Sequence, residues 1–261
     1  MRSCFSSEFC FLVSDFDKMS YFGISLALAI LAGLANLFGA AIVAARPWSR
    51  AFLSAFIALG SGFMLATVLT EMLPESLRLS PEWAPILILA GYLMVHFFEH
   101  SLPAHFHFGE ETHASEFLHA RVAYTALGGL LIHTFFDGVA ITAGFIVSTW
   151  LGVVISGAVI VHNIPEGFTI ASIMSAAGKP RRAGLAAAAA LGGSRLLGMF
   201  AMAVAHRAVQ YGLALSAGVT LYVAASDLIP EVNKKPSRRM ALTVVAGVAL
   251  VVLLRLLFLG S

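Results

Sequence analysis

Two short motifs in the middle of the chain each place a carboxylate four residues after a histidine. They read His133-Thr-Phe-Phe-Asp137 and His162-Asn-Ile-Pro-Glu166, and a glycine follows each acid. Residues four apart point from one face of a helix, so each motif can direct an imidazole and a carboxylate to the same place. These ligands suit zinc, iron, manganese and cadmium, whereas copper(I) favours thiolate. The spacing therefore predicts a site for a divalent cation.

The chain around these motifs has the composition of a polytopic membrane protein. Of its 261 residues, 59% are hydrophobic and 11% are charged, whereas about 25% are charged in soluble domains. A helix needs about 20 apolar residues to cross a bilayer. The sequence therefore predicts an all-α polytopic membrane protein with eight transmembrane helices, in contact with the lipid bilayer. The net charge of +2 gives no indication of nucleic-acid binding. The eight apolar runs are 21–45, 51–73, 83–98, 122–147, 150–177, 183–209, 211–229 and 240–258.

Basic residues follow the first, third, fifth and seventh apolar runs, whereas the alternate loops contain only Arg78 and Arg207. Because cytoplasmic loops are enriched in Lys and Arg, this bias predicts a multi-pass protein of the cell membrane with both termini outside. The basic residues are Arg46, Arg50, Arg121, Lys179, Arg181, Arg182, Lys234, Lys235, Arg238 and Arg239.

The first eighteen residues contain both cysteines, Cys4 and Cys10, and an apolar patch at 9–13. The patch is too short for a signal-peptide core, so residues 1–18 are predicted to be a flexible external tail, and Met19 could be the biological start. Residues 19–261 then form one eight-helix transmembrane domain. Within it, residues 99–120 are predicted to be a cytoplasmic His-rich loop, a composition typical of metal binding.

The second and seventh runs end alike, and their shared positions are in register. The matched residues are Gly62, Leu65, Glu71, Pro74 and Glu75 in one run and Gly218, Leu221, Asp227, Pro230 and Glu231 in the other. The predicted topology turns these two helices in opposite directions, as it does the helices that carry the two His motifs. Inverted repeats that meet at the midplane are typical of secondary transporters.

The two His motifs are predicted to reach the same depth. His133 lies twelve residues after Arg121, and His162 lies twelve residues after Trp150, which is about 18 Å from opposite sides at 1.5 Å per residue. A charge at the bilayer centre costs about 2.5 to 3.5 kcal/mol, so acids there need partners or a function. A bound cation explains both acids.

The two His motifs, together with Glu-Met-Leu-Pro-Glu at 71–75 and Asp-Leu-Ile-Pro-Glu at 227–231, resemble the ZIP (Zrt/Irt-like) metal transporters. The resemblance implies eight helices with both termini outside and transport of a divalent metal towards the cytoplasm. It also implies that helices 1, 4, 5 and 6 move against helices 2, 3, 7 and 8. Carried over by position, the metal ligands are His133, Asp137, His162 and Glu166, with Thr134 and Asn163 beside them.

The chain departs from the family pattern in helix 6. Many ZIP proteins carry a glutamate there that completes a second metal position, whereas this chain reads Arg195-Leu-Leu-Gly198. An arginine at the depth of the site must pair with carboxylate or face water, because it cannot be deprotonated. We expect the Arg195 guanidinium to take the second cation position and leave one transported metal. The alternative is that Arg195 faces a water-filled cavity and only tunes access.

Further polar residues mark a predicted path, with acids near both mouths and histidines near the exit. They are Glu71 and Glu75 at the outer mouth, Asp227 and Glu231 at the inner mouth, and His96, Glu99 and His100 at the end of helix 3. Acids at a membrane interface cost little, so Glu75 and Glu231 equally suit helix anchoring.

These features predict a transporter of divalent metal ions, zinc first and iron, manganese or cadmium as alternatives, that works by alternating access. The metal is then the transported substrate, and we expect no cofactor and no enzymatic activity. An intramembrane zinc hydrolase is an alternative, although no His-Glu-x-x-His motif occurs. A passive cation channel is another. Helices 3 and 8 could support a homodimer.

Overall fold

The computed structural model describes residues 7–45, 50–101, 120–233 and 237–259, and nearly all of these residues are helical. Eight helical segments follow one another in this part of the chain, which confirms the predicted all-α fold class. Seven are long and apolar enough to cross a membrane, and the apolar part of the remaining one, Ala84–Phe98, is shorter. The helices are α1 (Ser7–Ala45), α2–η1–α3 (Arg50–Thr67, Val68–Met72, Leu73–Leu79), α4 (Ala84–Ser101), α5 (Ala120–Val147), α6 (Thr149–Ala176), α7 (Arg181–Val204), η3–α8–η4–α9 (His206–Ala208, Val209–Tyr222, Val223–Leu228, Ile229–Asn233) and α10 (Arg238–Leu259).

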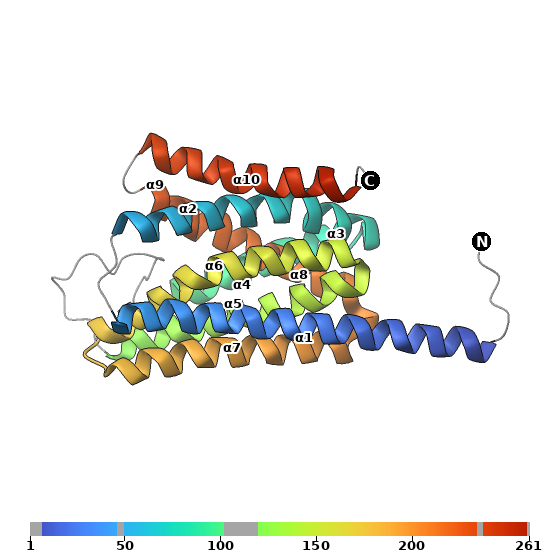
Figure 1. The fold of residues 1–261 in the computed structure, drawn as a ribbon, viewed down its shortest axis with the longest axis horizontal. Coiled ribbons are helices and arrows are strands. Elements are labelled where there is room, and N and C mark those ends of the chain that lie inside the picture. Colours follow the sequence, from blue (N-terminus) through green and yellow to red (C-terminus); the bar gives the residue numbers. More distant parts are fainter. Residues whose placement is uncertain (1–6, 46–49, 102–119, 234–236, 260–261) are drawn as a thin grey trace.

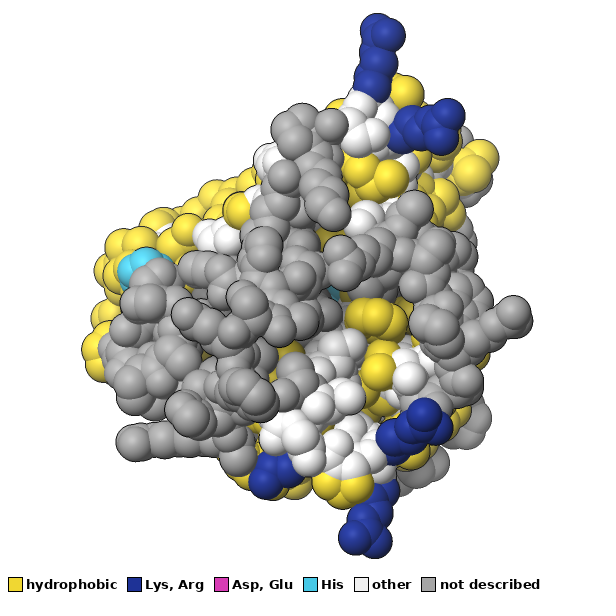
Figure 2. All heavy atoms as spheres, turned by 90° about the vertical axis from the view of Figure 1, so that its left-hand side faces the viewer, with side chains coloured by type: hydrophobic (Ala, Val, Ile, Leu, Met, Phe, Trp, Pro, Cys, Tyr) yellow, Lys and Arg dark blue, Asp and Glu magenta, His cyan; other side chains and the backbone are white. Residues whose placement is uncertain are grey.

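Both ends of the described chain lie at one end of the bundle. In Figure 1, α1 begins and α10 ends on the same side, and α2, α5, α7 and α10 begin on the opposite side. That opposite end is the one where sequence analysis places the basic loops. Figure 2 views this end and shows Lys and Arg side chains around its rim, with no acidic side chain among the described residues in view. With eight helical segments, the first and last described helices have their outer ends on the same side of the bundle (Figure 1).

Two boundaries differ from the sequence prediction. Residues 7–18, which the sequence assigned to a flexible external tail, are part of α1, which begins at Ser7. No Gly or Pro interrupts this helix before Gly23. The predicted His-rich loop at 99–120 is shorter, because α4 continues to Ser101 and α5 begins at Ala120. Residues 1–6 and 102–119 lie outside the described part.

A single residue separates the two helices that carry the His motifs. Ser148 is extended at φ −162°, and its Oγ accepts a hydrogen bond of 3.2 Å from the Leu151 N–H, which caps α6. At the other end of α6, Gly178 adopts φ +71°, where a side chain would be strained. The short connection holds α5 and α6 antiparallel, so the two motifs approach one level from opposite directions.

The helices pack as two groups. The first group is α1, α5, α6 and α7, and the second is α2 with α3, α4, α8 with α9, and α10. We call the boundary between them the seam; it is formed mainly by α5 against α8 and by α2 against α6. This division is the one that the resemblance to ZIP transporters implied for helices 1, 4, 5 and 6 against 2, 3, 7 and 8.

The second and seventh bodies share an interruption that supports the inverted repeat. Each contains a π-helical segment, Val68–Met72 and Val223–Leu228, directly before its proline-containing end. Proline has no N–H, so Pro74 and Pro230 cannot donate to the carbonyl four residues earlier. The α-helical hydrogen-bond pattern is therefore interrupted at both positions. Glu71 and Asp227 lie in these segments at matching positions. Glu75 and Glu231 lie just beyond, in α3 and α9.

Candidate metal centre

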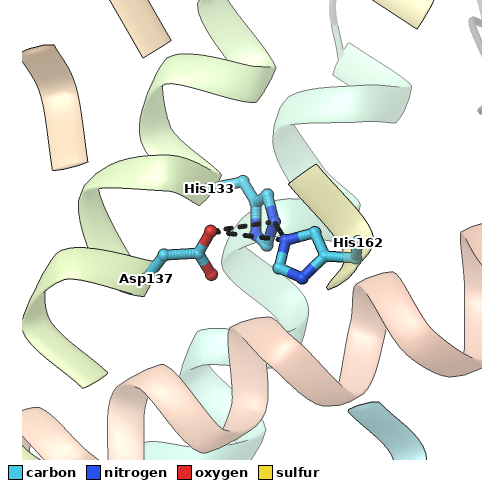
Figure 3. A group of neighbouring side chains, drawn as sticks. All are labelled: His133, Asp137 and His162. Atoms are coloured by element: carbon cyan, nitrogen blue, oxygen red, sulfur yellow. Dashed lines mark hydrogen bonds and ion pairs between the residues drawn. The ribbon is translucent and has the colours of Figure 1, made fainter. Parts of the chain in front are cut away.

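Three of the predicted ligands converge in the interior of the first group. His133 and Asp137 come from α5 and His162 comes from α6, and their side chains point toward one another (Figure 3). The Asp137 Oδ2 lies 3.6 Å from His133 Nε2 and 3.4 Å from His162 Nε2, and the two Nε2 atoms are 3.4 Å apart. All three residues are at most 3% exposed.

These separations match the ligand shell of a small divalent ion. Ligand atoms about 2.1 Å from a tetrahedral zinc lie about 3.4 Å from one another. The three atoms therefore need little rearrangement to bind one ion, with a fourth position left for another ligand. The ring of His162 is also oriented: its Nδ1 lies 2.9 Å from the Ala158 carbonyl oxygen. An N–H at Nδ1 donates there and leaves Nε2 free to bind metal.

Arg195 lies against this cluster and is completely buried. Its Nη2 donates to Asn163 Oδ1 at 2.9 Å and lies 3.5 Å from Asp137 Oδ2 and 3.7 Å from Glu166 Oε2. The guanidinium therefore pairs with both carboxylates, as a buried arginine requires. With neutral histidines, Asp137, Glu166 and Arg195 carry one net negative charge.

The remaining predicted ligands lie nearby but not in the three-residue cluster. Glu166 is completely buried on the Arg195 side. Asn163 uses both polar atoms, because its Nδ2 donates to the Ala32 carbonyl at 3.0 Å and its Oδ1 accepts from Arg195. Thr134 donates to the carbonyl of Leu131 at 3.2 Å. Asn163 thus joins α6 to α1 and to the arginine, whereas the Thr134 hydrogen bond lies within α5.

Comparison with known families decides what kind of protein carries this site. Residues 109–255, more than half of the chain, match the family model of the ZIP zinc transporters. The chain belongs to the ZIP zinc transporter family. Membership implies transport of divalent metal ions by a multi-pass membrane protein, and the buried His and Asp cluster fits a metal site. The metal is then a substrate rather than a cofactor. A search of curated proteins finds no match.

In this ZIP protein, the glycine after each motif acid lets another helix approach closely. A Cβ on Gly138 would overlap the Arg195 carbonyl oxygen, and a Cβ on Gly167 would overlap the Asn36 carbonyl oxygen. The first approach brings Arg195 of α7 to Asp137. The second brings Asn36 of α1 to the side of Glu166, where its side chain faces the carboxylate.

Asn36 is a site residue that sequence analysis missed. It is completely buried in α1, and neither of its side-chain polar atoms has a hydrogen-bonding partner of ordinary geometry among the described residues. A signal was present, because Asn36-Leu-Phe-Gly39 matches Arg195-Leu-Leu-Gly198. The match is structural too, since Gly39 and Gly198 are the glycines that α1 and α7 contribute to these two crossings.

The predicted path residues lie away from the cluster. Glu71 and Asp227 are buried in their π-helical segments, and each has interactions with neighbouring residues. Glu75 forms an exposed pair with Arg78 on the same helix, an arrangement that fits anchoring. His96 is exposed on α4, and its ring lies 5.9 Å from that of Tyr222. Glu99, His100 and Glu231 lie in α4 and α9.

Proposed function

We propose that this ZIP protein carries one divalent ion, zinc first, into the cytoplasm by alternating access through His133, Asp137 and His162. The observation that carries the proposal is the buried cluster, whose ligand atoms are 3.4 to 3.6 Å apart. Two neutral imidazoles and one carboxylate favour zinc over magnesium, which prefers oxygen ligands alone. Iron, manganese and cadmium remain candidates for the same ligands.

The arrangement of helices supports alternating access. All three clustered ligands belong to the first group, so an ion bound to them would travel with that group. The second group approaches the site through α2, where a Cβ on Gly60 would lie 3.5 Å from the Cα of His162. Movement along the seam would carry the ion from one side of the membrane to the other.

The direction of transport rests on the basic loops. If the end in Figure 2 faces the cytoplasm, both termini lie outside, Glu71 and Glu75 lie at the outer mouth, and Asp227, Glu231, His96 and His100 lie at the inner mouth. In this proposal the ion passes the outer acids, exchanges water for the clustered ligands and leaves past the inner acids. The His-rich segment, which lies mostly outside the described residues, would accept it.

Arg195 supports transport of a single ion. One divalent ion changes the net charge of the buried site from −1 to +1, and a second would raise it to +3 in a region without compensating acids among the described residues. In this proposal the guanidinium takes the place of a second metal and keeps Glu166 paired. Titration of the purified protein with zinc should give one bound ion; two ions per native chain would contradict this role.

Exposed apolar side chains on α4 and α10 suit contact with lipid. Leu89, Phe97, Val245 and Leu256 are each more than half exposed. We expect these faces to lie against acyl chains of the cell membrane. A homodimer through α4 and α10 is a further proposal, tested by the mass of the protein in a bilayer nanodisc.

Zinc uptake into proteoliposomes tests the function. Replacing both His133 and His162 with Ala should abolish uptake, because two of the three clustered ligands are lost. His206→Ala is the matched control, since His206 is exposed in η3. Normal uptake by the double variant would refute the proposal. Uptake should also weaken in acid, because these ligands bind metal only when deprotonated. A voltage-dependent current would identify a channel instead.

A further inference from the structure

The carboxylate of Glu71 is held from both sides of the seam. The Trp150 indole Nε1 donates to Glu71 Oε2 at 3.0 Å, and Arg255 Nε lies 3.5 Å from Glu71 Oε1. Trp150 belongs to α6 of the first group, whereas Glu71 and Arg255 belong to η1 and α10 of the second. Glu71 is only 8% exposed, although it lies near one end of the bundle.

The local backbone explains why these residues meet. Because Pro74 has no N–H, the carbonyl of Thr70 lacks its usual partner four residues later. That carbonyl accepts a hydrogen bond of 3.3 Å from Arg255 Nη1 instead. The Thr70 hydroxyl donates to the Ala66 carbonyl at 2.8 Å and lies 3.3 Å from Glu71 Oε1. The same guanidinium thus binds both the opened backbone and the carboxylate, which fixes Glu71 to face α6.

This contact is separate from the metal centre. Trp150 precedes His162 by twelve residues on α6, or about 18 Å along the helix axis. It lies at the end where the chain termini are found, the outer end in the proposed topology. Val154, one turn further along α6, is 2% exposed and packs against apolar residues of the second group. The contact therefore lies at the outer end of the seam, next to a layer of buried apolar side chains.

We propose that Trp150, Glu71 and Arg255 form a latch that holds the outer ends of the two groups together and must open for an ion to enter from outside. The inference rests on the proposed function, because only alternating access requires the seam to open at this end. Arg255 positions the carboxylate, and the Trp150 N–H crosses the seam. The latch is thus a gating device in the transport cycle, and none of its residues is a ligand of the metal centre.

Cysteine labelling of the full chain in nanodiscs tests the latch without any metal. The background replaces Cys4 and Cys10 with Ser, and Val154→Cys is the reporter, labelled with a water-soluble methanethiosulfonate. Adding Trp150→Phe keeps a smaller aromatic side chain at this position and removes the indole N–H. It should raise the labelling rate roughly tenfold, the effect of losing a hydrogen bond to a charged group. Arg255→Gln should raise the rate less, because Arg255 is 46% exposed.

Trp83→Phe is the matched control, since Trp83 is 53% exposed and lies just before α4. Its labelling rate should equal that of the background. Met174→Cys is a second reporter, buried within the first group against α1 and α7, and should stay unlabelled in every variant. An unchanged rate at Val154→Cys in the Trp150→Phe protein would overturn the latch. So would an equal rise at Met174→Cys, because it would mean general loosening.

The two proposals can fail separately. Labelling needs no ion, so the latch can be disproved while zinc uptake through His133 and His162 stands. Conversely, uptake can be absent while Trp150→Phe still exposes Val154→Cys, which would leave a gate in a protein of another function. If both hold, Trp150→Phe should also change the initial rate of zinc uptake, whereas Trp83→Phe should not.

Discussion

Helix crossings within each group differ from the contacts across the seam. Inside the groups, four crossings bring glycines against backbone: at each of them, a Cβ would overlap a carbonyl oxygen of the facing helix. Across the seam, a Cβ on Gly60 would lie 3.5 Å from His162, and one on Gly157 would lie 3.4 Å from the Phe63 ring. The crossings pair α1 with α6, α5 with α7, α2 with α10 and α4 with α8.

This difference suits two rigid groups of helices that meet along a boundary where contacts can change. Two helices whose backbones are in direct contact have few alternative positions, because protein interiors are close-packed and no side chain lies between them to adjust. Ordinary side-chain contacts across the seam can be exchanged for others, as the proposed alternating access requires. The glycine crossings thus make two stable units, and the metal centre lies in one of them at the boundary with the other.

The largest effect on stability is expected at Arg195, where the glycine crossing of α5 and α7 brings the guanidinium to the candidate metal site. Arg195→Leu leaves Asp137 and Glu166 buried without their cation, which should destabilise the protein by about 3 to 5 kcal/mol. Thermal unfolding in detergent measures this, with Arg195→Lys as the charge-preserving control. A stable Arg195→Leu protein that still binds one zinc would show that the crossing does not depend on the ion pairs.

Two glycines of α2 compare the two kinds of contact directly. Gly62→Ala places a methyl group on the Val244 carbonyl inside the second group and should cost about 1 to 3 kcal/mol of stability. Gly60→Ala faces the seam and has room for a methyl group, so its stability should match or exceed the native value. Both are measured by thermal unfolding in the same detergent.

The inverted repeat sharpens that comparison. Gly218→Ala meets the Ile88 carbonyl as Gly62→Ala meets that of Val244, so the two variants should lose equal stability within error. Equal losses at Gly60 and Gly62 would break the distinction between seam and crossing, and unequal losses at Gly62 and Gly218 would break the structural equivalence of the repeats.

Asn36 tests whether the α1 crossing contributes to binding. Glu166 lies beside Arg195 and outside the cluster, so Asn36→Ala acts on the ligand Asp137 only through the Arg195 ion pairs. It should weaken zinc binding by less than the change of about tenfold that is typical of residues that orient a metal ligand directly. Isothermal titration in detergent measures it. Ser25→Ala is the control, because Ser25 is equally buried in α1 and bonds only its own helix, at the Tyr21 carbonyl. Equal affinities in the native and Asn36→Ala proteins would contradict this role.

The smallest effect is expected at Glu75. Its carboxylate is paired with Arg78 on the protein surface, where ion pairs contribute little. Glu75→Gln should therefore leave both thermal unfolding and zinc uptake within error of the native protein, in contrast to Glu71→Gln, which removes the charge from the latch. A strong loss of uptake in Glu75→Gln would restore this acid to the transport path.

The sequence was informative wherever a property follows from local pattern. Hydropathy predicted eight helices, and counting residues from the helix ends placed His133, His162 and Arg195 at one depth. The same reasoning could not sort the polar residues at that depth. Thr134 donates to a backbone carbonyl, and Asn163 bonds both a carbonyl and Arg195. Asn36 was missed because a single amide in an apolar run forms no motif with its neighbours in the sequence.

The sequence by itself determined the helices, their alternating direction and the inverted repeat, because hydropathy and helical period act within one helix. It also included the three clustered residues in a larger set of predicted ligands. Tertiary structure decided which side chains meet: Arg195 with Asp137 and Glu166, Asn36 with Glu166, and Trp150 with Glu71 and Arg255. These contacts join helices far apart in the chain, and their partners depend on how closely the glycines let backbones approach.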